Sequence, residues 1–137
     1  MHLKEVIKEL ENTVRLTGLK RSDIRIGNGS AMIFYGLREQ TNDVDAAIPG
    51  NLFNELMKDK RFKVIQFKSY LDGSTRYIVN IGKVDIHNED DTPDFKGPTK
   101  DFKGYRVDVP STILKFKQKM NRPKDQADIK TLMAYVE

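Results

Sequence analysis

Two aspartates, Asp43 and Asp45, stand two positions apart and lead into the apolar residues of a short run. On a β-strand, residues two apart point to the same face, so both carboxylates would share one face. Carboxylate oxygens are the ligands that Mg²⁺ prefers in proteins. The pair therefore marks a candidate site for a divalent cation.

A glycine-rich turn precedes this pair, in the segment IGNGSAMIFYG at residues 26–36. It leads into a short apolar stretch that is typical of a helix, which Ser30 can cap. Free backbone N–H groups at such a turn and at the start of a helix attract phosphate oxygens. An anion-binding turn and a metal-binding carboxylate pair would then lie side by side.

The order of Gly29-Ser30 and a later Asp-hydrophobic-Asp pair resembles the nucleotidyltransferase superfamily typified by DNA polymerase β. Three further segments sharpen the resemblance to the AbiEii-like members. Residues 36–43, GLREQTND, are similar to their G-x-R-x-x-T-x-D pattern. Residues 83–87, KVDIH, are similar to the strand with the third carboxylate, and residues 117–129, KQKMNRPKDQADI, to the last motif.

The resemblance implies that Asp43, Asp45 and Asp85 are catalytic and hold the metal, which would be Mg²⁺, with Mn²⁺ as the alternative. It also implies a set of residues that bind a nucleoside triphosphate: Gly27, Asn28, Gly29, Ser30, Arg38, Lys117, Arg122 and Asp125. Asn28 departs from the pattern, because the family usually has glycine there. Asn tolerates positive φ better than most residues, so we expect the turn to form.

The carboxylates outside the Asp43 pair each allow a structural interpretation. A buried and unpaired Asp85 would be costly, and a metal ion is one way to offset that cost. The alternative is a surface-facing aspartate on an amphipathic strand. The acidic run at residues 89–91 is typical of a solvated loop. His87 follows Asp85 on the same strand face and could contact a substrate, although a lone histidine is more often an ordinary polar residue.

The lysine-rich segment near residue 117 also has two interpretations. It is either the solvated face of an amphipathic helix or, by the resemblance, the source of the triphosphate contacts at Lys117 and Arg122. A salt bridge between Arg122 or Lys124 and Asp125 at the start of a helix would explain the last motif without a ligand.

The whole chain has 137 residues, of which 38% are hydrophobic and 32% charged, as expected for one soluble domain spanning residues 1–137. No apolar run approaches a membrane span, and the charged N-terminal segment is unlike a signal peptide, so we expect a cytoplasmic protein. The absence of cysteine excludes disulfides and thiolate sites. A net charge of +4 favours polyanionic ligands.

Hydrophobic periodicity predicts helices interleaved with a short mixed β-sheet, an α/β or α+β fold that suits the nucleotidyltransferase core. We expect helices at residues 3–14, 30–35, 51–60, 110–120 and 124–136. We expect strands at residues 24–26, 43–48, 62–67, 76–81 and 84–86, with a turn at Asp72-Gly73. Residues 88–103 are expected to form a surface loop, and residues 105–109 an edge strand.

The sequence thus predicts a Mg²⁺-dependent nucleotidyltransferase that moves a nucleoside monophosphate from a nucleoside triphosphate to an acceptor hydroxyl. RNA, a protein and a small molecule remain open as acceptors, and no membrane partner is expected. The main alternative is a non-catalytic protein on the same fold, either an antitoxin-like regulator or a binder of nucleotides or nucleic acids. A basic nucleic-acid-binding module is a third hypothesis, but the aromatic platforms and helix-turn-helix spacing of common modules are missing.

Overall fold

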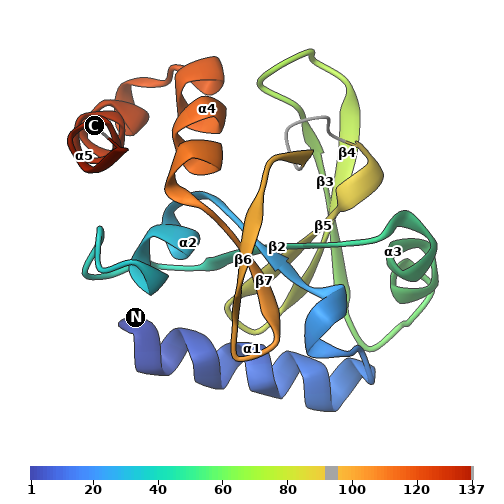
Figure 1. The fold of residues 1–137 in the computed structure, drawn as a ribbon. Helices are drawn as coiled ribbons and strands as arrows, with labels where there is room; N and C mark the ends of the chain where they lie inside the picture. Colours follow the sequence, from blue (N-terminus) through green and yellow to red (C-terminus); the bar gives the residue numbers. More distant parts are fainter. Residues whose placement is uncertain (92–95, 137) are drawn as a thin grey trace.

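A seven-stranded mixed β-sheet forms the centre of the computed structural model, which describes residues 1–91 and 96–136 (Figure 1). The strands lie in the order β3-β4-β5-β2-β1-β7-β6. Their bounds are β1 Arg25–Ile26, β2 Val44–Ile48, β3 Lys63–Lys68, β4 Thr75–Ile81, β5 Val84–Asn88, β6 Thr99–Phe102 and β7 Tyr105–Asp108. The pairs β2/β5 and β1/β7 are parallel, and the other neighbours are antiparallel.

Helices flank this sheet, with α4 and α5 packed together at one end (Figure 1). Their bounds are α1 Leu3–Thr17, α2 Asn28–Phe34, α3 Gly50–Met57, α4 Pro110–Met120 and α5 Gln126–Val136, with short 3₁₀ turns η1 Arg21–Asp23, η2 Glu89–Asp91 and η4 Pro123–Asp125. Within the described residues, no helix is long and apolar enough to cross a membrane.

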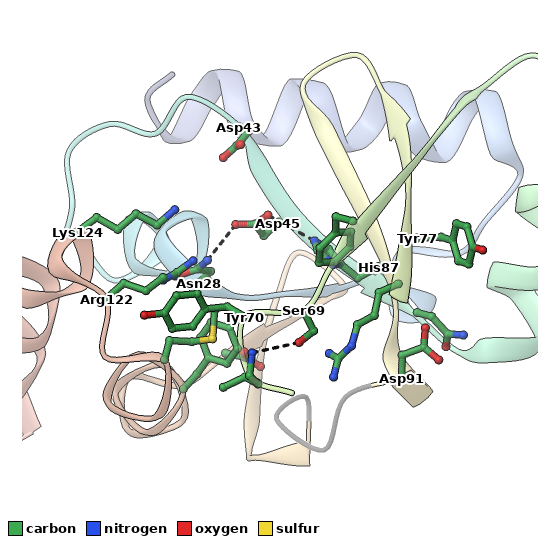
Figure 2. A pocket seen from close by; sticks show the side chains of 17 residues that line it. Asn28, Asp43, Asp45, Ser69, Tyr70, Tyr77, His87, Asp91, Arg122 and Lys124 are labelled. Carbon is green, nitrogen blue, oxygen red and sulfur yellow. Dashed lines mark hydrogen bonds and ion pairs between the residues drawn. The ribbon is translucent and has the colours of Figure 1, made fainter. Parts of the chain in front are cut away.

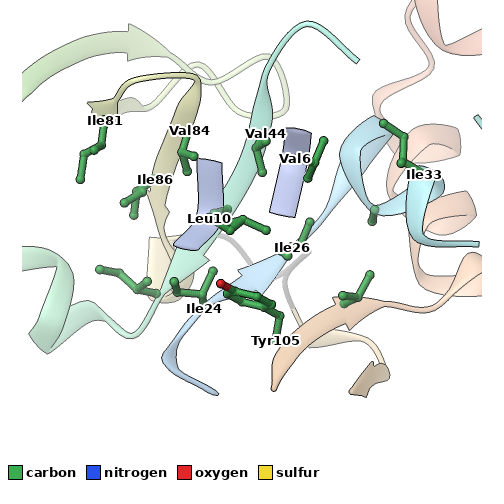
Figure 3. Close-up of a cluster of buried hydrophobic side chains, with 14 of the residues drawn as sticks. Val6, Leu10, Ile24, Ile26, Ile33, Val44, Ile81, Val84, Ile86 and Tyr105 are labelled. Carbon is green, nitrogen blue, oxygen red and sulfur yellow. The ribbon is translucent and has the colours of Figure 1, made fainter. Parts of the chain in front are cut away.

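The alternation of side chains gives the sheet two different faces. Val44 and Ala46 of β2 are paired in register with Val84 and Ile86 of β5, and all four are buried. The helix α1 covers this apolar face with a stripe that includes Leu10, which is fully buried (Figure 3). Burying one such leucine side chain stabilises the fold by about 1.5–3 kcal/mol. The same alternation turns the polar residues of β2 and β5 to the opposite face.

Most of the expected elements are confirmed within one to three residues at each end, and so is the fold class of a mixed sheet flanked by helices. The helix α1 continues to Thr17, three residues beyond the predicted end, and Gly18 closes it with φ +74°. Gly18 provides this left-handed cap because it lacks a Cβ.

Three predictions of local structure are wrong. The segment at residues 105–109 is not an edge strand, because β7 lies between β1 and β6. The expected loop at residues 88–103 contains strand β6, which pairs with β7 through a tight turn at Lys103-Gly104. Its residues 92–95 lie outside the described part of the chain. Ser30 does not cap α2, which begins at Asn28 after the N-cap Gly27.

Candidate active site

The glycine-rich turn connects β1 to α2 and contributes one residue, Asn28, to the candidate site. Asn28 has φ +56°, which confirms the expected left-handed turn. Its side-chain amide donates a hydrogen bond to Asp45 Oδ2 at 3.2 Å, and its Oδ1 is buried without a hydrogen-bond partner among the described residues. The side chain of Asn28 therefore links the turn directly to Asp45.

Ser30 fastens this turn to the first residues of β2. Its hydroxyl donates to the carbonyl oxygen of Gly27 at 2.8 Å and accepts a hydrogen bond from the backbone N–H of Asp45 at 3.0 Å. Ser30 is buried, so its side chain supports the turn from inside. In this structure the hydroxyl has protein partners on both sides, and it does not line the cavity described below.

The carboxylates of Asp43 and Asp45 lie at the start of β2 and face a common cavity (Figure 2). His87 of β5 lies across from Asp45, with 3.6 Å between Nε2 and Oδ1. Partial desolvation raises the pKa of the Asp43 carboxyl, and the negative charges of Asp45 and Asp85 raise it further. The three carboxylates are thus close enough to repel one another.

Asp85 stands directly beside Asp45 in the parallel pairing of β5 with β2, on the same face of the sheet. Asn80 of β4 donates a hydrogen bond to its carboxylate at 2.9 Å, and Asp85 is not one of the residues that line the cavity. Within the described residues, no group of three or more carboxylate or histidine side chains is gathered in a way that could hold a metal ion.

A cavity of about 260 Å³ lies between this face of the sheet and the end of α4 (Figure 2). Its lining includes Asp43, Asp45 and Asn28 together with the cations Arg122 and Lys124. Further lining residues are Phe67, Ser69, Tyr70, Leu71, Arg76, Tyr77, His87, Asn88, Asp91, Asp108, Phe116 and Met120. Anionic and cationic groups therefore line the same cavity.

Arg122 is held in place by a buried carboxylate. Its guanidinium donates to both oxygens of Asp125, at 2.8 Å from Nε and 3.0 Å from Nη2. Burial alone would raise the pKa of Asp125, but the hydrogen bonds from Arg122 and the charge of Lys117 hold that pKa below its usual range. Asp125 is itself buried and does not line the cavity, so it acts on the site through Arg122.

Lys117 lies inside the packing between α4 and α5. Only 3% of the residue is exposed, and its Nζ pairs with Asp125 at 3.4 Å and Asp128 at 3.1 Å. It does not line the cavity. The structure therefore places Lys117 in a buried ion network and not at the surface of the lysine-rich helix.

Arg38 joins this network to the glycine-rich turn. Its Nη1 lies 3.3 Å from Asp128 Oδ2, and its guanidinium covers Gly29 so closely that a Cβ there would overlap it. The charge of Arg38 also counteracts the raised pKa of Asp43. Arg38, Gly27 and Gly29 do not line the cavity, whereas Asn28 of the same turn does.

Sequence reasoning missed two parts of the lining. The first part is Tyr70 in the β3–β4 turn, with Phe116 and Met120 on α4. The signal that could have found Tyr70 is an aromatic residue in a surface turn between two strands. The second missed part of the lining is Asp108, which is buried and paired with Arg25 at 2.7 Å. Burial raises the pKa of Asp108 to about 6 against the opposing charge of Arg25.

Comparisons with known proteins agree with the fold class predicted from the sequence. No protein-family model matches the chain, and no curated protein matches it. Among solved structures, a crystal structure of ANT(2'')-Ia in complex with adenylyl-2''-tobramycin matches with a TM-score of 0.53 and 14% sequence identity. The match covers 97% of this chain and 88% of that one. At this low identity the similarity shows the fold alone: the chain has a nucleotidyltransferase-type fold.

Proposed function

We propose that the protein transfers a nucleoside monophosphate from a nucleoside triphosphate to an acceptor hydroxyl. The observation that carries the proposal is the composition of the cavity, whose lining combines Asp43 and Asp45 with Arg122, Lys124 and the turn residue Asn28. A triphosphate needs cations for its oxygens, and nucleotidyl transfer needs its α-phosphate held in line with the acceptor. The fold shared with a protein that binds an adenylylated tobramycin agrees with this reaction class.

The donor set at the turn fits Mg²⁺. Asp43 and Asp45 offer carboxylate oxygens, and Asn28 adds a buried amide oxygen with no partner among the described residues. Burial and the negative charges of Asp45 and Asp85 raise the pKa of Asp43, and a bound cation would offset both by stabilising the ionised carboxylate. When bound, the ion would neutralise charge on the transferring phosphoryl group.

The chain's own residues account for the rest of the reaction. Arg122 and Lys124 bind phosphate oxygens, and Asp125 fixes the direction of the Arg122 guanidinium by two hydrogen bonds. The acceptor oxygen forms a bond to the α-phosphorus, the bond to the β-phosphate oxygen breaks, and pyrophosphate leaves. That Asp85 takes the proton of the acceptor hydroxyl stays a prediction, which requires its carboxylate to reach the cavity that it does not line in this structure.

Labelled triphosphates test the proposal. With Mg²⁺ and a mixture of RNA, protein and small hydroxyl compounds, we expect label from the α-position to appear in an acceptor and label from the γ-position to appear in pyrophosphate. Each triphosphate should also raise the melting temperature, because a ligand that binds only the folded state stabilises it. Asp43→Asn should abolish transfer and most of the shift. Indifference of the wild type to all four triphosphates at millimolar concentration would refute the proposal.

A second candidate function is binding without transfer, as in a regulator on the same fold. The specific observation in its favour is that Asp85 is hydrogen-bonded to Asn80 and lies off the cavity lining. Under this alternative, triphosphates raise the melting temperature but no acceptor becomes labelled. The two measurements therefore separate the enzyme from the binder.

A further inference from the structure

One end of the cavity differs in chemistry from the rest. Phe116 and Met120 of α4 stand four residues apart, so they lie on the same face of the helix. Leu71 and Tyr70 of the β3–β4 turn contribute from the sheet side. These four side chains form an apolar and aromatic lining, which we name the aromatic slot.

The aromatic slot adjoins the cations of the site. Arg122 follows Met120 by two residues, just past the C-cap Asn121 of α4, so the wall of the cavity changes from apolar to cationic where the helix ends. In Figure 2 the ring of Tyr70 extends toward Arg122 and Lys124. A nucleoside triphosphate has the same division, because a flat apolar base and a polyanion lie at opposite ends of one ribose.

The exposure of Tyr70 is unusual for an aromatic side chain with a structural role. Of this residue 64% is exposed, although it borders a cavity and sits at a turn. Ser69 beside it is buried and accepts the N–H of Leu71 at 3.2 Å, which holds the turn in place. A tyrosine ring that is anchored in this way but uncovered presents a free face to a ligand.

We propose that the aromatic slot binds the nucleobase of the triphosphate, with Tyr70 stacking on one face of the base. This inference rests on the proposed nucleotide site and adds the residues that hold the base. Stacking uses the π-face that every base has, so the slot should accept all four bases, with purines bound more tightly than pyrimidines. The polar end of the cavity, at His87, Asn88 and Asp91, stays open for the acceptor.

The chain itself offers a clean reporter, because it contains no tryptophan. Tyr70→Trp places a single indole in the slot, and Tyr135→Trp, on an exposed position of α5, serves as the matched control. With Mg²⁺ present, we expect ATP, GTP, CTP and UTP to quench the indole at position 70 and not the one at position 135. Tripolyphosphate, which has no base, should bind without quenching.

Affinities complete the test. Tyr70→Ala should weaken binding of ATP roughly tenfold and leave binding of tripolyphosphate unchanged, because the lost stacking concerns only the base. Tyr70→Phe should keep the wild-type affinity, since the ring and not the hydroxyl stacks. Equal affinities of wild type and Tyr70→Ala for ATP, with no quenching at position 70, would overturn the slot while tripolyphosphate binding upheld the nucleotide site. Failure of both ATP and tripolyphosphate to bind would overturn both proposals.

Discussion

The two walls of the cavity are built by different means. On the sheet wall, strand register places Asp45 beside Asp85 and puts the Asn28 turn next to them. On the helical wall, a chain of ion pairs among side chains from three elements positions the cations, with Arg122 at its end. One wall depends on backbone pairing and the other on buried charge.

Because of this difference, substitutions in the two walls should differ in their effects on activity and on the free energy of unfolding. On the sheet wall, burial and the charges of Asp45 and Asp85 raise the pKa of Asp43, so the ionised Asp43 carboxylate is held at some cost to the folded state. The ion network of the helical wall satisfies every charge it contains, because Lys117 faces two carboxylates and Asp125 faces two cations. We therefore expect substitutions in the sheet wall to affect activity and those in the helical wall to affect folding first.

The largest expected effect is on the sheet wall. Asp45→Asn should lower kcat/KM for nucleotidyl transfer by on the order of 10³-fold, because it removes one of the two carboxylates that would hold the Mg²⁺ ion beside the reacting phosphate. The free energy of unfolding should stay constant or rise slightly, since the repulsion from Asp43 is relieved. Transfer kinetics and urea unfolding measure the two quantities. Asp101→Asn, at an exposed residue of β6 that does not line the cavity, is the control, and a loss of stability in Asp45→Asn comparable to its loss of activity would contradict the comparison.

The helical wall should respond in the opposite way. Lys117→Met leaves Asp125 and Asp128 without their shared cation and should lower the free energy of unfolding by about 3–5 kcal/mol. Lys115→Met, at an exposed position of the same helix, should change it by less than about 0.5 kcal/mol. Urea unfolding of both variants checks this. If the two lysines proved equally dispensable, the buried network would not stabilise the helical wall.

The carboxyl group of Asp108 should make the free energy of unfolding depend on pH. Its folded-state pKa of about 6 lies above the ordinary 3.8, so the folded protein binds the proton more tightly than the unfolded chain does. Its contribution to stability is therefore fully present below pH 3.8 and is lost as the pH rises through 6, by roughly 1–3 kcal/mol. Urea unfolding at pH 4, 5 and 6 should show this decline. Asp108→Asn should be less stable overall, because Arg25 loses its partner's charge, but should lack this part of the slope.

The sheet wall could be predicted from the sequence because its information is local. The alternation of Asp43 and Asp45 with apolar residues and the positive φ of Asn28 follow from spacing and residue type. Of the helical wall, the salt bridge between Arg122 and Asp125 could be predicted, because the two residues are three positions apart, and the structure confirms it. The position of Lys117 could not be predicted, because a lysine in a polar helix looks solvated unless its partners are known. Only the folded chain brings Asp125 and Asp128 to Lys117, and only the β3–β4 turn brings Tyr70 to the cavity.

The smallest expected effect concerns Arg38, which links the two walls. Gly29→Ala would place a methyl group where the Arg38 guanidinium packs on the turn. Because that guanidinium is the far end of a flexible and partly exposed side chain, it can move aside, and the free energy of unfolding should change by no more than about 1 kcal/mol. The affinity for tripolyphosphate should fall a few-fold, since the Arg38 cation moves away from the turn that borders the cavity through Asn28.

A double-mutant cycle with Arg38→Ala identifies the cause of that loss. If Gly29→Ala acts by displacing Arg38, it should have no further effect on tripolyphosphate affinity once Arg38 is already alanine. An equal loss in both backgrounds would mean instead that the methyl group itself blocks the backbone N–H groups of the turn. The phosphate would then contact the turn directly, and the helical wall would reach the ligand through Arg122 and Lys124 alone.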